Sequence, residues 1–181
     1  MSHEKLSKDE IADFAIREVR NSGYENVALR TLAKNMNRST GIIYSHFNSR
    51  KHLYTYIIKY IMNTLACEKL ISTNEGSAKE NVIKLCTNYI HWYLEDPNIV
   101  SLLIKDNELN ISRGDWFSFS IVKETINLLL KLKLEENLEF DEQTLFIQLL
   151  ASLNGYIFLL NYGIVSYDSQ YVIKTVENLI Q

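Results

Sequence analysis

Turn-forming residues are scarce in this chain, which contains one proline and six glycines among 181 residues. Sandwiches and barrels of short strands need frequent tight turns, and such turns are rich in glycine and proline. Apolar residues recur instead at the helical period along most of the sequence. We therefore expect an all-α protein.

Cysteine motifs and membrane-spanning runs are also lacking. Cys67 and Cys86 have no CxxC spacing, so they provide no metal or disulfide framework. We expect two free thiols in a reducing cytosol, with a redox switch as the alternative. The N-terminus is polar, and polar amides interrupt the apolar residues 143–170. These features predict a cytoplasmic protein, and no residue spacing indicates a metal or cofactor.

Carboxylates are absent from residues 28–59, although this stretch carries six cationic side chains: Arg30, Lys34, Arg38, Arg50, Lys51 and Lys59. Residues 1–60 have a net charge of +4, from ten Lys or Arg against six Asp or Glu; residues 61–181 have −7, from nine against sixteen. The first third would attract a polyanion and the rest would repel one. Any single cation could be a solvated surface charge, but the set indicates a nucleic-acid interface.

Two short helices joined by a turn are predicted inside this basic stretch. The first covers residues 29–35, Asn37 tolerates the left-handed conformation of a tight turn, and Ser39 is suited to cap the second helix. In that second helix Ile43 and Phe47 are four residues apart and should face the core, which leaves its other side free. The pattern predicts a helix-turn-helix whose second helix reads DNA.

Caps and apolar periodicity predict about nine helices in all. The first begins at a capping box formed by Ser7 and Glu10 and ends at Gly23. The fourth should run from residue 48 or 49 to about residue 69, and the others should cover about residues 77–95, 97–106, 116–133, 141–162 and 169–180.

The eighth of these helices is apolar nearly all round, so it should be buried on both sides. One side can face the core of the chain, and a partner subunit is the simplest cover for the other. Together with the ninth helix it predicts a dimer interface formed by Ala151, Ser152, Gly155, Val172, Val176 and Leu179.

A longer pattern surrounds the predicted helix-turn-helix. It comprises Ala15, Gly23-Tyr24, Leu29-Arg30-Thr31-Leu32-Ala33, Ser39-Thr40-Gly41-Ile42-Ile43-Tyr44-Ser45-His46-Phe47, and Leu53. The pattern covers about residues 7–53 and resembles the DNA-binding domain of the tetracycline-repressor (TetR-like) family of bacterial transcriptional regulators. The resemblance implies an all-helical homodimer, with a helix-turn-helix domain over residues 1–48 and a helical effector-binding and dimerisation domain over residues 49–181.

The chain departs from the family's pattern at four positions. Ala28 stands where a capping Ser or Thr is usual, and Asn37 replaces the turn glycine. Arg38 replaces a small apolar residue, and Arg50 stands where Lys is common. At position 50 the positive charge is kept, but Arg and Lys differ in the geometry of their hydrogen bonds. Together the four departures leave the operator sequence open.

Base reading is expected from Thr40, Gly41 and Ile42, since Thr bonds base edges, Gly permits close approach and Ile can meet a thymine methyl group. For Ile42, packing is the alternative. Phosphate contacts are expected from Arg30, Arg38, Ser39, Tyr44, Arg50 and Lys51, and the resemblance adds His46. A surface histidine is the alternative for His46.

An aromatic pocket for the effector is expected from Tyr89, Tyr93 and Trp116, although aromatics at helical spacing are more often core residues. His91 lies among polar positions of its helix, which favours solvent exposure over a metal or haem role.

These observations predict a dimeric, ligand-responsive transcriptional regulator. It would act as a repressor on a near-palindromic double-stranded DNA operator, from which an unknown small-molecule effector releases it. The alternative is an architectural or partner-controlled DNA-binding protein without a small-molecule pocket. The sequence offers no nucleophile–base pair and no phosphate loop, so we do not expect an enzyme.

Overall fold

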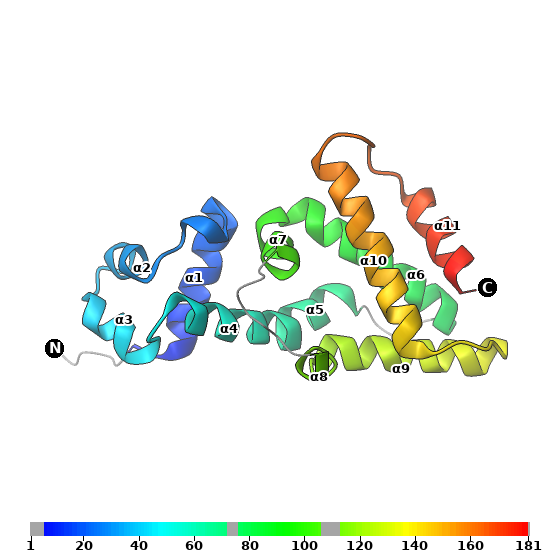
Figure 1. The fold of residues 1–181 in the computed structure, drawn as a ribbon, viewed down its shortest axis with the longest axis horizontal. Helices are drawn as coiled ribbons and strands as arrows, with labels where there is room; N and C mark the ends of the chain where they lie inside the picture. The colour runs from blue at the N-terminus through cyan, green and yellow to red at the C-terminus, as the bar shows by residue number, and fades with distance from the viewer. Residues whose placement is uncertain (1–5, 72–75, 106–112, 181) are drawn as a thin grey trace. The chain divides into compact units, whose positions relative to one another are not determined.

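The computed structural model describes residues 6–71, 76–105 and 113–180, and within these ranges the chain is helical and has no strand (Figure 1). The α-helices are α1 (Lys8–Ser22), α2 (Leu29–Asn35), α3 (Thr40–His46), α4 (Arg50–Tyr60), α5 (Ala66–Leu70), α6 (Ala78–Glu95), α7 (Pro97–Lys105), α8 (Arg113–Trp116), α9 (Ser120–Glu136), α10 (Glu142–Asn161) and α11 (Ser169–Leu179). A 3-10 turn, η1 (Tyr24–Asn26), follows α1, and a π-helical turn, η2 (Ile61–Leu65), joins α4 to α5. The all-α prediction is confirmed.

The predicted number of helices also matches within the described ranges. The backbone stays helical from α4 through η2 to α5, so these elements form the long fourth helix that the sequence predicted. With this run counted once, and with the four-residue α8 set aside, nine α-helices remain. The predicted end of the sixth helix near residue 106 lies outside the described residues.

The chain divides into two compact units. The first contains Met1–Ile61 and Asp96–Asn110, and the second contains Met62–Glu95 and Ile111–Gln181. The unit that holds the helix-turn-helix therefore also includes α4 and α7. A functional boundary after residue 48 stays a prediction.

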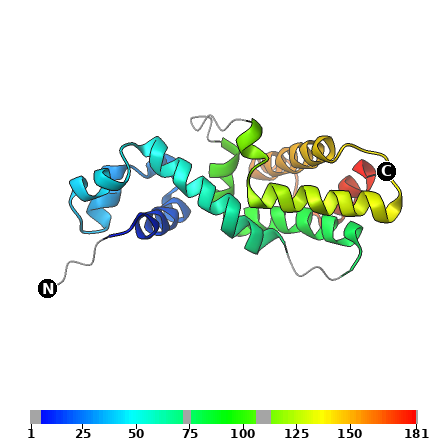
Figure 2. The same ribbon diagram turned by 90° about the horizontal axis from the view of Figure 1, so that it is seen from below.

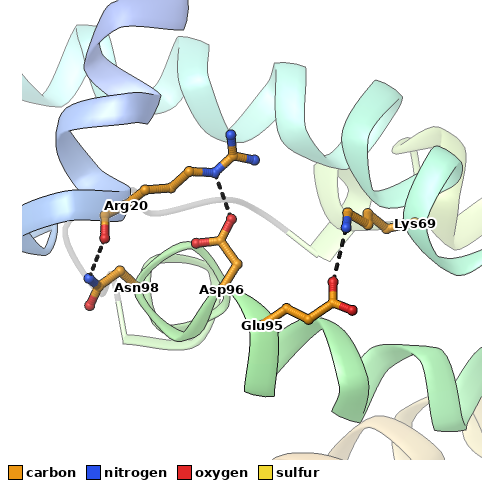
Figure 3. A network of polar contacts seen from close by, with 5 residues as sticks. All are labelled: Arg20, Lys69, Glu95, Asp96 and Asn98. Carbon is orange, nitrogen blue, oxygen red and sulfur yellow. Dashed lines mark hydrogen bonds and ion pairs between the residues drawn. The ribbon is translucent and has the colours of Figure 1, made fainter.

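The first unit is built around α1. Its capping box is present: Glu10 N–H donates to Ser7 Oγ at 3.1 Å, and Ser7 N–H donates to Glu10 Oε2 at 2.7 Å. At the other end, α7 packs beside α1, where Arg20 Nε donates to Asp96 Oδ2 at 2.6 Å and Asn98 Nδ2 donates to the Arg20 carbonyl at 2.8 Å (Figure 3). These contacts anchor the scaffold that carries α2 and α3.

The second unit is built around α6, which contacts α5, α9, α10 and α11. Figure 2 shows α6 and α9 side by side. Ala78 N–H, at the start of α6, donates to Glu135 Oε2 near the end of α9 at 2.8 Å, so the two helices are antiparallel. An ion pair of Lys69 with Glu95, at 3.1 Å, joins α5 to the end of α6 (Figure 3).

Helix α11 buries its apolar face within this unit, which corrects part of the predicted dimer interface. Val172 and Val176 are completely buried, because the Val172, Val176 and Ile180 stripe packs inward and α11 contacts α6. A partner subunit cannot reach these two side chains, so they leave the interface. Leu179 is half-buried.

Helix α10 has an open side. Ala151 and Gly155 are exposed, Ser152 is half-buried, and Ile147 and Phe158 on the same side are 46% and 55% exposed. By length and composition this is the one helix of the described residues that could cross a membrane, with a mean hydropathy of 1.4. A single helix of this kind is weak evidence for a membrane protein, since buried core helices pass the same test.

Candidate functional site

The turn between α2 and α3 is fixed by backbone hydrogen bonds and by one left-handed residue. Asn37 has φ of +52°, as its side chain allows, and Arg38 N–H donates to the Ala33 carbonyl at 2.9 Å. Ser39 caps α3, with its hydroxyl accepting from Ile42 N–H at 3.4 Å. The predicted roles of Asn37 and Ser39 in shaping the turn are confirmed.

Helix α3 is held by two side chains and exposes the rest. Ile43 and Phe47 are completely buried, as predicted. Thr40 and Gly41 are exposed, and Ile42, at 39% exposed, is not taken up by the core. All three predicted base readers are therefore accessible to solvent at the start of α3.

Gly41 has no packing role inside the chain. A Cβ atom built on it would meet only Ser39 Oγ, at 4.0 Å, which is an ordinary contact. The packing of the chain therefore does not require glycine at this position. Because Gly41 has no side chain, the backbone of α3 is uncovered beside Thr40. Close approach of another molecule is the use that this geometry allows.

Most predicted phosphate contacts lie on the same unit and are accessible. Arg30, Arg38 and Lys51 are exposed, Tyr44 is 44% exposed, and His46 is half-buried. Ser39 is exposed while its hydroxyl caps α3. Asn35 Nδ2 donates to Glu18 Oε2 at 2.6 Å, which ties α2 to α1.

Arg50 has a different environment from the other cations. It is half-buried, its Nη2 donates to the Tyr24 carbonyl at 2.7 Å, and its guanidinium lies 5.1 Å from the centre of the Tyr54 ring. The Tyr54 hydroxyl donates to the same carbonyl at 2.7 Å. Arg50 thus fastens α4 to η1, an internal role that its basic sequence context did not indicate.

The predicted aromatic pocket is only partly assembled. Tyr89 and Tyr93 lie on one face of α6, where their hydroxyls donate to Asn154 Oδ1 at 2.8 Å and to Asn161 Oδ1 at 3.1 Å. Burial raises the pKa of both hydroxyls, so they stay protonated donors. Trp116 lies in α8 and packs edge-on against Phe119, 5.9 Å away. The tyrosines therefore connect α6 to α10, and Trp116 has a separate partner.

A cavity of about 150 Å³ lies elsewhere in the second unit, between α5, α6 and α9. Asn81 and Glu124 are among its lining residues, and none of the three predicted aromatics is. Sequence reasoning missed these residues because an isolated Asn and an isolated Glu on amphipathic helices look like ordinary surface positions.

The remaining candidates for a chemical role are one histidine and two cysteines. His91 is exposed, as predicted, and its Nε2 lies 2.6 Å from the Tyr167 hydroxyl. Cys67 and Cys86 are free, and burial raises the pKa of Cys86 to about 12, so it is a neutral thiol. Within the described part of the chain no cluster of three or more His, Cys, Asp or Glu could hold a metal.

Comparison with known proteins relates this geometry to solved structures. No protein-family model matches the sequence, and no curated protein matches it. A TetR-family transcriptional regulator from Haemophilus influenzae is similar over 95% of this chain and 93% of its own, with a TM-score of 0.68 at 18% identity. The chain has the TetR-family fold.

Two further solved structures are similar to this chain over nearly its whole length. The transcriptional regulator FadR from Bacillus subtilis, in complex with stearoyl-CoA, is similar over 97% of this chain and 98% of its own, with a TM-score of 0.69 at 17% identity. A protein of unknown function from Rhodococcus sp. RHA1 is similar over 100% of both chains, with a TM-score of 0.77 at 16% identity. The resemblance seen in the helix-turn-helix pattern is confirmed at the level of the fold.

Proposed function

We propose that this protein is a dimeric, cytoplasmic, ligand-responsive transcriptional repressor that binds a near-palindromic operator. The observation that carries the proposal is the free surface of α3. Thr40, Gly41 and Ile42 face outward while Ile43 and Phe47 fix the helix to its unit. Accessible cations lie on the same unit, and residues 28–59 contain no carboxylate to oppose a phosphate backbone.

The proposed contacts fall into two classes. Thr40, Gly41 and Ile42 read base edges in the major groove. Phosphates are bound by Arg30, Arg38, Ser39, Tyr44, His46 and Lys51, with Arg50 acting instead within its own unit. Base contacts confer sequence preference, and phosphate contacts confer affinity that falls with salt.

The proposed dimer uses the open side of α10, with Ala151, Ser152 and Gly155 at its centre and Leu179 of α11 beside them. The small residues permit close approach of a second helix. A two-fold dimer would place two α3 helices about 34 Å apart, one turn of DNA, so the operator should be nearly palindromic.

The proposed effector site is the helical second unit. The stearoyl-CoA complex of FadR from Bacillus subtilis supports a ligand-responsive role for this fold. Effector affinity and DNA affinity would be coupled reciprocally, so an effector that binds the free protein better weakens DNA binding.

In vitro selection of DNA, followed by gel shifts with variants, tests the proposal. Thr40→Ala is expected to weaken binding to the selected DNA by about 1–3 kcal/mol and to leave binding to random DNA unchanged. Lys51→Ala should weaken both alike and lower the salt slope by about 1. Selection that enriches no palindrome, or equal losses on both DNAs for Thr40→Ala, would refute the reader assignment. Full operator binding that no compound changes would favour the partner-controlled alternative.

A further inference from the structure

The cavity between α5, α6 and α9 combines apolar and polar side chains. It is lined by Leu70, Ile71, Leu85 and Leu128, and by Asn81, Glu124, Asn127 and Lys131. Its volume of about 150 Å³ lies below the range of roughly 300–1,000 Å³ that drug-sized ligands occupy. A small ligand is the appropriate occupant.

Asn81 supplies an amide side chain to the lining of this cavity. The residue is only 6% exposed, and its Nδ2 reaches the Gly76 carbonyl at 3.5 Å, longer than an ordinary hydrogen bond. Its amide oxygen Oδ1 is a hydrogen-bond acceptor, to which a ligand group with an N–H or O–H would donate.

The register of α6 against α9 places Asn81 and Glu124 toward opposite ends of the cavity, with Asn127 between Glu124 and Lys131. Because Ala78 contacts Glu135 in this antiparallel pair, Asn81 lies level with Lys131. Glu124 precedes Lys131 by two helical turns, a distance of about 10 Å along α9. A ligand that meets both ends must therefore be elongated.

The charges at the two ends differ. Lys131 Nζ lies 3.5 Å from Glu135 Oε1, so that end already contains a matched pair. Glu124 is exposed and has no ion-pair partner within the described ranges, and it lines the cavity together with Leu70 of α5. Burial first and the Glu124 charge second raise the pKa of Cys67, also in α5. An unpaired carboxylate at a ligand cavity selects a cation.

We propose that this cavity binds a small organic ammonium compound as the effector. The ammonium group lies at Glu124, an apolar chain covers Leu70, Leu85 and Leu128, and a neutral donor such as a hydroxyl reaches Asn81 Oδ1. The inference deepens the proposed function and rests on it only in naming this ligand as the effector.

Three probes of equal chain length separate these features in a calorimetric titration. Aminohexanol, with its amine and hydroxyl at opposite ends, is expected to bind with a dissociation constant in the millimolar range. Hexylamine lacks the hydroxyl and should bind about fivefold more weakly, the worth of one hydrogen bond. Hydroxyhexanoate carries the opposite charge and should not bind.

Two variants and a control identify the groups. Glu124→Gln should weaken both amines about fivefold, as expected for a partly exposed ion pair, while Glu136→Gln, an exposed change on the same helix, should have no effect. Asn81→Leu should reduce the affinity for aminohexanol to the affinity for hexylamine. Three results would each overturn the proposal. They are binding of hydroxyhexanoate that is tighter than binding of the amines, amine affinity that Glu124→Gln does not change, and no amine binding at millimolar concentration. Should Asn81→Leu not fold, the comparison of aminohexanol with hexylamine in the native chain decides the role of Asn81.

The proposed regulator function and the proposed ligand site are tested by different measurements. A native protein that selects no DNA refutes the regulator, whereas the titration measures the ligand site without DNA. On selected DNA, aminohexanol should weaken binding by the native protein and have less effect on Glu124→Gln. Equal effects on both proteins would refute the effector role of this cavity.

Discussion

Replacement of Arg50 by alanine tests whether this cation binds DNA or holds the fold. In the structure its Nη2 donates to the Tyr24 carbonyl at 2.7 Å, and its guanidinium lies 5.1 Å from the Tyr54 ring centre. A hydrogen bond from a charged group contributes about 1.5–3 kcal/mol, and a cation–π contact at a partly exposed site about 0.5–1 kcal/mol. Because Arg50 is half-buried, the lower ends apply, and Arg50→Ala should cost about 2 kcal/mol of unfolding free energy.

The expected change is easily measured. In a chain of this length, 1 kcal/mol shifts the Tm by about 2–4 °C, so Arg50→Ala should lower it by roughly 4–8 °C in a circular-dichroism melt. Tyr54 still donates to the Tyr24 carbonyl, which keeps the loss from being larger. At a temperature where the variant is folded, the salt slope of DNA binding should not change.

Lys51→Ala is the matched control, since Lys51 is the next residue and is exposed. It should leave the Tm unchanged and lower the salt slope by about 0.9, the contribution of one phosphate contact. The opposite pattern, an unchanged Tm and a lower salt slope for Arg50→Ala, would refute the internal role and restore the phosphate contact predicted from the sequence.

Three further predictions concern a cap, a turn and the proposed interface. Ser7→Ala should cost about 1 kcal/mol in chemical denaturation; hydrogen bonds from Ser7 lower the pKa of Glu10, so their stabilisation is present above pH 4.5 and is lost as the pH falls through the folded-state pKa, and the variant should lose less stability on acidification. Asn37→Val should cost about 1–2 kcal/mol because φ is +52° there, whereas Asn37→Gly should stay within about 0.5 kcal/mol of the native chain. Gly155→Leu should leave the monomer folded, as a Cβ there meets nothing within 4 Å, and should raise the monomer fraction in analytical ultracentrifugation; an unchanged dimer would exclude this face of α10.

The helix-turn-helix could be predicted in detail because its determinants are local. A serine that caps α3, an asparagine in the left-handed region, and two apolar residues four apart determine the geometry within a few residues. The free face of α3 follows directly, since a side chain opposite Ile43 and Phe47 has no core to enter. Local hydrogen bonding and helical period therefore predicted most of the candidate DNA surface.

Arg50 and α11 show where local reasoning ends. Position 50 lies in a basic stretch, and only the folded chain brings it to the carbonyl of Tyr24, twenty-six residues away. Val172 and Val176 form an apolar stripe that could cover either a partner or its own core. The sequence does not distinguish these covers, and the packing of α11 on α6 decides for the core.

The proposed effector cavity depends even more strongly on contacts between residues far apart in the sequence. Its lining comes from three helices, and the contact of Ala78 with Glu135 marks the register between two of them. A one-turn slip of α9 would move Glu124 by about 5 Å, and would separate Lys131 from the level of Asn81. The placement of the unpaired carboxylate is thus a property of the packed unit. A probe that senses both ends, such as aminohexanol, tests that register as directly as it tests the ligand.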